Sequence, residues 1–285
     1  LLRQTVGHDV TVDSLRRIAG GDINEAALAE TSEGPIFVKW NRGSHDDLFV
    51  REAEQLRRMR RADTSLVIPE PIAAVRPDGD RPAMLLLEYL ESRPKVDDFD
   101  ERLGRGLAEL HEHTSENGFG FDHDNYCGET PQPNGWTDDW VTFYREERLR
   151  HQLKLAVDGR SVSQSDRRAY ERLLDRLDEI IGIDPEPPAL IHGDLWSGNL
   201  HTAPDGRPAL IDPAAYFGHR EAELGMMELF GGYSTTVYRA YEEYRPLQEG
   251  WRGRLPVYKL YHLMNHYNLF GGHWGGQAFD LVRQL

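Results

Sequence analysis

Three polar residues in one stretch of the chain combine groups that metal and proton chemistry require. The stretch from Ala189 to Glu221 reads ALIHGDLWSGNLHTAPDGRPALIDPAAYFGHRE. Asp194 and Asp212 each follow a short apolar run of the kind that forms a buried strand, and Asn199 lies between them. Carboxylate and amide oxygens are the ligands that Mg²⁺ prefers, and a carboxylate can also accept a proton from a hydroxyl group. We therefore expect these residues to meet at one reactive site.

The chemistry that best accounts for this set is phosphoryl transfer, which requires a group for the acceptor hydroxyl, metal ligands and a cation over the phosphates. Asp194 suits the first role, and Asn199 and Asp212 suit the second. Lys39 suits the third, because it is the only lysine before residue 95 and ends the apolar run IFVKW. Glu52 follows thirteen residues later in a helical pattern and is its expected ion-pair partner. Glu54, the alternative, lies about 200° further around a helix.

The order of these residues resembles the protein-kinase-like superfamily. The pattern H-x-D-x-x-x-x-N followed by a second Asp is similar to the catalytic loop and metal-binding Asp of that superfamily, with DPA in place of Asp-Phe-Gly. The resemblance implies ATP and Mg²⁺ as cofactors. It implies that the backbone of Gly20, Gly21 and Asn24 approaches phosphates, and that backbone groups of Glu88 and Leu90 contact adenine. A turn stabilised by Asp and Asn side chains is the simpler alternative, but it does not explain all the residues together.

The arrangement of apolar patterns predicts an α+β, bilobal fold with a small β-rich N-lobe and a larger, mainly helical C-lobe. We expect a hairpin from 26–28 and 36–38, a helix after residue 44, and a buried strand in PAMLLLEYLE. Further helices are expected in DDFDERLGRGLAELHEHT and throughout the last third of the chain. The boundary is predicted near residue 92, which gives a nucleotide-binding lobe over 1–91 and a catalytic, acceptor-binding lobe over 92–285.

Composition excludes several classes of protein. The chain has 285 residues and a net charge of −15, which argues against a nucleic-acid partner. It contains no apolar run of about 18 residues, the minimum for a membrane span. A lone cysteine, Cys127, excludes an internal disulfide framework and favours a cytoplasmic location. With only four lysines, the acidic chain is typical of a protein adapted to high salt.

Longer motifs narrow the family. HGDLWSGN followed by IDPAAYFGHREAELGMMELFGG resembles the fructosamine/ketosamine-3-kinase family, as do GFGFDHDNYCGETPQPNGWTDDWVTFYREERL and LYHLMNHYNLFGG. The resemblance covers nearly the whole chain. It implies ATP-dependent phosphorylation of the 3-hydroxyl of a ketosamine (a ribulosamine, erythrulosamine or fructosamine adduct), which promotes deglycation. Some members carry a redox-active cysteine in the phosphate loop where this chain has Asp22, so a disulfide-linked dimer is not expected, and we predict a monomer or weak dimer.

Acceptor binding is assigned to four residues with less specific signals. Trp196 follows the proposed base and offers an aromatic face to a sugar, although a core Trp that closes the loop explains it equally well. His219, Asn265 and His266 are further candidates to contact the acceptor. The alternatives to a ketosamine kinase are an aminoglycoside- or choline-type phosphotransferase, a nucleotide-binding pseudokinase, and a hydrolase that uses Asp194 and Asp212. The hydrolase leaves Lys39 unexplained.

Overall fold

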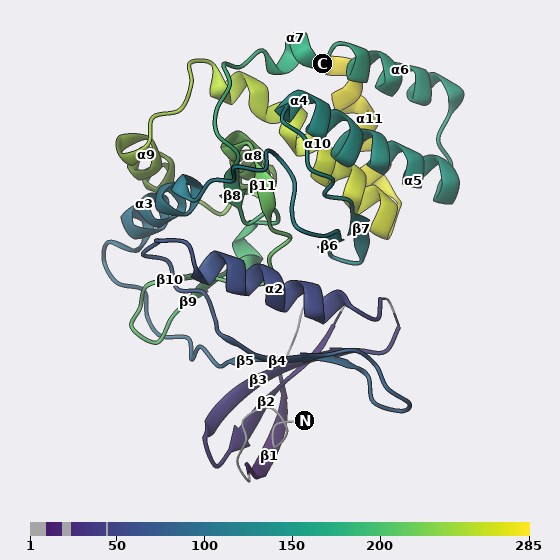
Figure 1. The fold of residues 1–285 in the computed structure, drawn as a ribbon. Helices are drawn as coiled ribbons and strands as arrows, with labels where there is room; N and C mark the ends of the chain where they lie inside the picture. The colour runs from purple at the N-terminus through teal and green to yellow at the C-terminus, as the bar shows by residue number, and fades with distance from the viewer. Residues whose placement is uncertain (1–9, 19–23, 44) are drawn as a thin grey trace.

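The computed structural model describes residues 10–18, 24–43 and 45–285. Its N-terminal part is a five-stranded antiparallel sheet with the strand order β1-β2-β3-β5-β4 (Figure 1). The strands are β1 (Val12–Ile18), β2 (Glu25–Thr31), β3 (Gly34–Asn41), β4 (Pro71–Val75) and β5 (Ala83–Glu88). The predicted hairpin is confirmed as β2 and β3, and the predicted apolar strand as β5.

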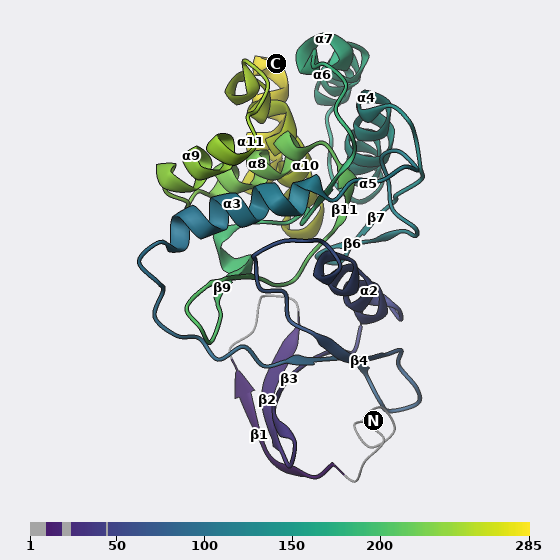
Figure 2. The same cartoon turned by 60° about the vertical axis from the view of Figure 1, so that its left-hand side comes forward.

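Helix α2 (Leu48–Arg60) lies between this sheet and the rest of the molecule (Figure 2). Phe49, Ala53 and Leu56 lie on one side of the helix at the spacing of an amphipathic helix, and all three are fully buried. The opposite end of the chain contributes to the same core, because the hydrophobic cluster that contains these residues continues through the C-terminal helices. Burial of this face fixes the rotation of α2, and therefore the direction in which Glu52 points.

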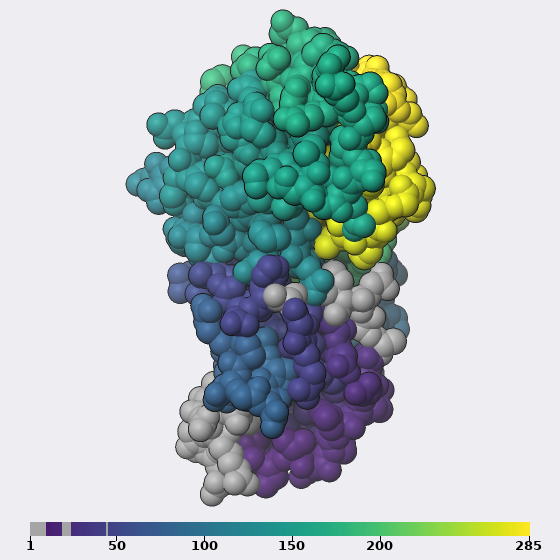
Figure 3. Space-filling view, turned by 90° about the vertical axis from the view of Figure 1, so that its right-hand side faces the viewer, coloured from purple at the N-terminus to yellow at the C-terminus, as the bar shows by residue number. Residues whose placement is uncertain are grey.

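The C-terminal part is mainly helical and forms the broader end of the molecule in the space-filling view (Figure 3). Between α4 and α5 the helix widens over η1 (Tyr144–Arg150), and a short turn of 3₁₀ helix, η2, covers Ser197–Asn199. The α-helices are α3 (Phe99–Glu112), α4 (Trp140–Phe143), α5 (His151–Gly159), α6 (Gln164–Asp175), α7 (Leu177–Ile181), α8 (Arg220–Phe230), α9 (Thr235–Tyr244), α10 (Trp251–Phe270) and α11 (His273–Gln284).

Three short antiparallel ladders lie in the C-terminal part, and two of them come from the stretch 189–221 that contains Asp194, Asn199 and Asp212. They are β6 (Asn125–Cys127) with β7 (Thr130–Gln132), β8 (Ala189–Ile191) with β11 (Tyr216–Gly218), and β9 (Leu200–Thr202) with β10 (Pro208–Leu210). Asp194 follows β8 and Asp212 follows β10, so the two acids extend from the ends of strands in different ladders rather than from one hairpin.

The α+β fold with a β-rich N-terminal part and a helical C-terminal part is as predicted. The chain leaves β5 at Glu88 and enters α3 at Phe99, and the predicted boundary at residue 92 falls within this connection. The division into a nucleotide-binding lobe over 1–91 and a catalytic lobe over 92–285 stays a prediction. Within the described ranges, no helix combines the length and apolarity needed to cross a membrane.

Candidate active site

Lys39 joins the two parts of the molecule through two carboxylates. Its Nζ donates to both carboxylate oxygens of Glu52, at 3.2 and 3.1 Å, and to Oδ1 of Asp212 at 2.9 Å. Lys39 comes from β3, Glu52 from α2, and Asp212 from the turn after β10. Glu54, the alternative partner, instead binds Arg51 and faces away from the lysine. The predicted pair of Lys39 with Glu52 is therefore confirmed as a contact.

The charges in this trio are set by burial and by one another. Burial by itself would lower the pKa of Lys39, but Asp212 and Glu52 outweigh it and raise that pKa, so the ammonium stays protonated. Burial raises the pKa of Glu52, and the nearby Asp212 carboxylate adds to the effect against the attraction of Lys39. Although burial acts in the opposite direction, Lys39 lowers the pKa of Asp212. Asp212 is thus the ionised acid, and its side chain is 43% exposed.

Asp212 also has an unusual backbone. Its φ of 55° makes it the one non-glycine residue with positive φ among the described parts of the chain. This conformation costs about 1–2 kcal/mol for a residue with a Cβ, and such costs are tolerated mainly where function requires them. The strained turn points the carboxylate at Lys39 rather than back along β10.

Asp194 and Asp212 are connected through Asn199. The Nδ2 of Asn199 donates to the Asp194 carbonyl at 2.8 Å, to Asp194 Oδ2 at 3.3 Å, and to the Asp212 carbonyl at 3.4 Å. Burial, Asp212 and Glu223 raise the pKa of Asp194 well above its usual value, which brings the carboxylate closer to the basicity that a proton acceptor needs. The sequence-predicted trio of Asp194, Asn199 and Asp212 therefore meets at one place.

His192 and Gly193 hold the loop that carries Asp194. Nε2 of His192 lies 2.9 Å from the carbonyl of Ile211, which ties the Asp194 loop to the residue that precedes Asp212. Gly193 has a φ of 81°, and a Cβ there would lie 2.2 Å from the Ala214 carbonyl oxygen. Only glycine permits this approach, so the two acidic segments run closer together than any other residue at 193 would allow.

Glu223 completes the loop and was missed in the sequence. This fully buried side chain of α8 accepts hydrogen bonds from the backbone N–H groups of His192 and Gly193, the latter at 3.1 Å. The only signal was an acid within the apolar run EAELGMMELF, and no spacing rule relates it to a loop thirty residues earlier. Glu223 thus positions Asp194 by holding the backbone of the two residues that precede it.

A second set of buried amides, also missed as a group, holds the segment after Asp212. Gln55 of α2 accepts from the Ala215 N–H, and Asn125 donates to the Ala215 carbonyl at 2.8 Å. Gln132 donates to the Ala214 carbonyl at 3.0 Å. These contacts connect α2 and the β6–β7 ladder to the Asp212 turn, so the position of Asp212 depends on side chains from two other regions of the chain.

Trp196 lies at the surface, in the loop that carries Asp194. One face of its ring covers Gly198, where a Cβ would come within 2.1 Å of the indole, and the side chain stays 42% exposed. Phe230 lies 6.4 Å from Trp196 between ring centroids, and His266 lies 5.0 Å from Phe230. Trp274 packs against both Phe230 and His266. Trp196 therefore covers its own loop without being a core residue, and it begins a row of aromatic side chains. Its contact with a sugar stays a prediction.

His219 and Asn265 do not lie in this aromatic row. His219 is 1% exposed, acts as the N-cap of α8, and packs between Trp140 and Tyr258. Asn265 is buried on α10, where it donates to the carbonyl and the sulfur of Cys127. The structure thus places Trp196 and His266 in one aromatic row, but places His219 in the core, because the α8 N-terminus is covered by α4 and α10. The contact of Trp196 and His266 with an acceptor stays a prediction.

The expected nucleotide contacts are described in part. Gly20, Gly21 and Asp22 lie outside the described residues. Asn24 is described, and its Oδ1 accepts from Asn41 of β3 at 3.0 Å. After β5, the carbonyl of Leu90 lies 2.8 Å from His201 Nε2, and the Glu88 N–H donates to the Glu70 carbonyl. The Leu90 carbonyl, one of the backbone groups expected near adenine, is therefore in contact with His201.

Comparison with known proteins identifies the family. The fructosamine kinase family model matches residues 1–285. The chain belongs to the fructosamine kinase family. A Synechocystis protein named "Probable ketoamine kinase" is 37% identical over 99% of this chain and 94% of its own length. The chloroplastic protein-ribulosamine 3-kinase of Arabidopsis thaliana is 37% identical over 98% of this chain and 84% of its own.

Solved structures agree with this family membership. A Thermobifida fusca protein assigned as a fructosamine-3-kinase superposes with a TM-score of 0.86 at 36% identity, covering 99% of this chain and 96% of that one. An aminoglycoside phosphotransferase, APH(4)-Ia, superposes with a TM-score of 0.62 at 19% identity, covering 99% and 97%. The second likeness shows the kinase-like fold alone. The chain is thus an ATP-dependent kinase, and it has the bilobal kinase-like fold that the sequence predicted.

Proposed function

We propose that this chain transfers the γ-phosphoryl group of ATP to the 3-hydroxyl of a ketosamine, which promotes loss of the sugar from the amine. The observation that carries the proposal is the contact of Asn199 with both Asp194 and Asp212, while Lys39 binds Asp212 from the other side. This arrangement supplies a proton acceptor, metal ligands and a cationic side chain for the phosphates in one place. The relatives named as ketoamine and ribulosamine kinases support ketosamines as the acceptor class.

Asn199 and Asp212 suit Mg²⁺. All the hydrogen bonds that Asn199 makes with its side chain in the described parts of the chain use Nδ2, so its amide oxygen is left for a cation. Asp212 offers a partly exposed, ionised carboxylate next to it. An amide oxygen and a carboxylate are hard ligands that match the preference of Mg²⁺, which takes its other positions from phosphates and water. The bound ion would neutralise charge on the transferred phosphoryl group.

The remaining roles are proposed from the contacts of Lys39, Asp194 and Trp196 and from the family resemblance of the sequence. Lys39, held by Glu52, orients the phosphates. Asp194 accepts the proton of the acceptor hydroxyl, and Trp196 with His266 contacts the sugar or the amine-bearing part of the acceptor. On the sequence resemblance alone, the backbone of Gly20, Gly21 and Asn24 is assigned to the phosphates, and the Glu88 carbonyl and the Leu90 N–H are assigned to adenine. A cytoplasmic location and a monomeric or weakly dimeric state stay predictions from the sequence.

The test is ADP release in the presence of Mg²⁺ with ribulosamine, erythrulosamine and fructosamine derivatives, and with an aminoglycoside as the alternative acceptor. We expect turnover with at least one ketosamine, and a 3-phosphate product by ³¹P NMR. Asp194→Asn should fold and bind ATP as the wild type does while losing most of its turnover, because the carboxylate acts in the transition state. Turnover with the aminoglycoside alone, or an unimpaired Asp194→Asn variant, would overturn the proposal.

A further inference from the structure

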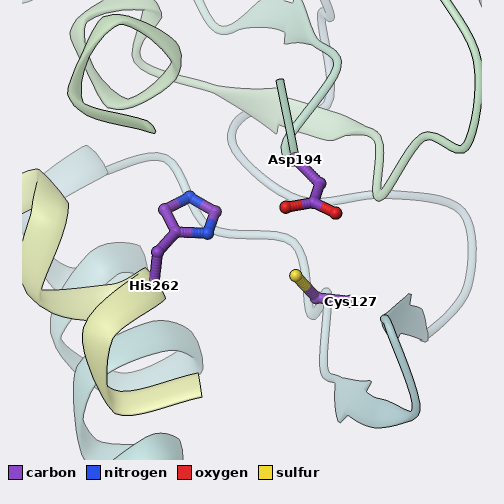
Figure 4. Close-up of side chains that lie close together, drawn as sticks. All are labelled: Cys127, Asp194 and His262. Atoms are coloured by element: carbon purple, nitrogen blue, oxygen red, sulfur yellow. The ribbon is translucent and has the colours of Figure 1, made fainter. Parts of the chain in front are cut away.

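Three side chains with metal-ligating atoms converge beside the Asn199–Asp212 pair. Cys127 comes from the end of β6, Asp194 from the loop after β8, and His262 from α10, and Figure 4 shows all three turned towards one another. One ligand atom from each residue lies within 4.8 Å of the others. Cys127 and His262 are 2% and 4% exposed, so protein encloses these two members of the cluster.

His262 has an unsatisfied nitrogen in this cluster. Its Nδ1 is buried and makes no hydrogen bond with the described residues. In Figure 4 this nitrogen is the one on the side of the ring that faces Cys127 and Asp194. Burial lowers the pKa of His262 to about 3, so the imidazole is neutral. A buried, unpartnered nitrogen with a lone pair costs free energy unless a ligand satisfies it, and a neutral imidazole nitrogen is a preferred ligand of Zn²⁺.

The sulfur of Cys127 is held in place by a neighbouring amide. Nδ2 of Asn265 lies 3.3 Å from Cys127 Sγ and 3.3 Å from the Cys127 carbonyl, and donates to both. Gln152 donates in turn to the Asn265 oxygen at 3.2 Å, which fixes the amide orientation. This donor orients the sulfur. Burial raises the pKa of the Cys127 thiol well above its usual value, so the free site holds the thiol, and its proton leaves only when a metal binds. Cys127 is the only cysteine of the chain, so any thiolate signal belongs to it.

We propose that Cys127, Asp194 and His262 form a binding site for Zn²⁺ that switches the enzyme off. The sulfur, carboxylate oxygen and imidazole nitrogen supply three ligands of a tetrahedral ion, with water in the fourth position. Tetrahedral ligand atoms are about 3.3–3.6 Å apart at ordinary Zn²⁺ bond lengths, so the cluster contracts slightly on binding. The thiol loses its proton to solvent as the Zn–S bond forms, and the two anionic ligands neutralise the ion.

The site differs from the proposed Mg²⁺ position in the chemistry of its ligands. Asn199 and Asp212 provide only oxygen, which Mg²⁺ prefers, whereas sulfur and imidazole select a softer ion. Asp194 Oδ2 accepts from Asn199, and the carboxylate is shared between the two sides. A zinc ion on Asp194 occupies the lone pair that would accept the hydroxyl proton. The consequence for activity rests on the proposed role of Asp194, whereas binding itself does not.

Binding is tested first, without turnover. The full chain is titrated with Co²⁺, which substitutes for Zn²⁺ and shows a thiolate-to-cobalt charge-transfer band. We expect one Co²⁺ per chain, displacement by Zn²⁺, loss of the band in Cys127→Ser, and at least tenfold weaker binding in His262→Gln. His113→Gln, on a half-buried histidine outside the cluster, is the matched control and should bind as the wild type does. Absence of the band in the wild type, or its persistence in Cys127→Ser, would overturn the site.

Inhibition is tested second, with Mg²⁺ and ATP in excess. Zn²⁺ should inhibit the wild type and His113→Gln reversibly, with recovery on chelation, while Cys127→Ser and His262→Gln need at least tenfold more Zn²⁺. Equal inhibition of all four proteins would refute the switch. If no ketosamine is phosphorylated, the proposed function fails while the Co²⁺ band still decides the metal site, so the two failures are distinguishable.

Discussion

The buried Glu223 allows a quantitative test of how the Asp194 loop is held. Its carboxylate accepts from two successive backbone N–H groups, those of His192 and Gly193. Glu223→Gln keeps one acceptor oxygen but places an NH₂ group against the second N–H. The variant loses one hydrogen bond to a charged acceptor, worth about 1.5–3 kcal/mol, and leaves a buried donor unsatisfied at a further cost of about 1 kcal/mol. We expect a loss of about 3 kcal/mol in the free energy of unfolding.

The same change should reduce catalysis selectively. A displaced loop moves Asp194 while the contact between Lys39 and Glu52 stays in place, so kcat should fall at least tenfold and KM for ATP should change less than threefold. Urea unfolding followed by circular dichroism gives the stability, and steady-state kinetics with ATP varied gives the two constants.

Glu228→Gln is the matched control for this experiment. Glu228 lies on the same helix, α8, but is exposed and pairs with Lys259. Exposed ion pairs contribute about 0–1 kcal/mol, so this variant should stay close to the wild type in both measurements. If Glu223→Gln loses less than about 1 kcal/mol and keeps its kcat, the carboxylate does not hold the loop.

Four further outcomes are expected. Lys39→Met should lower kcat/KM for ATP at least tenfold, whereas Lys154→Met, at an exposed ion pair, should leave it unchanged; equal values in steady-state assays would mean that the N-terminal part is misinterpreted. Gly193→Ala should lower the urea midpoint and kcat, because its Cβ meets a backbone oxygen at 2.2 Å, while Gly159→Ala has open space and should change neither. Burial lowers the pKa of His219 to about 3, so the unfolded state takes up the proton first as the pH falls. The free energy of unfolding should therefore decrease below about pH 6.5, by about 1.4 kcal/mol between pH 7.5 and 5.5. Unfolding of His219→Asn, which keeps an N-cap acceptor, should show that much less pH dependence. The net charge of −15 predicts a higher urea midpoint in molar NaCl, and an unchanged or lower midpoint contradicts the high-salt interpretation.

The reactive residues were predictable because their signals are local. Asp194 and Asn199 are five residues apart in one loop. Lys39 and Glu52 are thirteen residues apart, on a strand and the next helix. The helical period decides between Glu52 and Glu54 without any tertiary information, because only one side of α2 is apolar. The choice of Glu52 is confirmed by its contact with Lys39.

The supporting residues were not predictable in the same way. Glu223 contacts a loop about thirty positions earlier, and Gln55 contacts the N–H of Ala215, which is 160 positions away. Buried polar side chains must find partners wherever the fold offers them, and no sequence period encodes such a partner. His219 illustrates the converse error, because a histidine inside a functional motif can be part of the core.

The sequence by itself determined the fold class, the family and the types of the reacting groups, because apolar periodicity and short motifs are properties of neighbouring residues. The tertiary structure alone decided which polar side chains face one another across the molecule. It placed Asp212 in a strained turn against Lys39, joined Trp196 to an aromatic row, and enclosed Cys127 and His262 beside Asp194. These contacts join β3, β6, β8, β10 and α10, and their relative positions depend on the packing of a core shared by the whole chain.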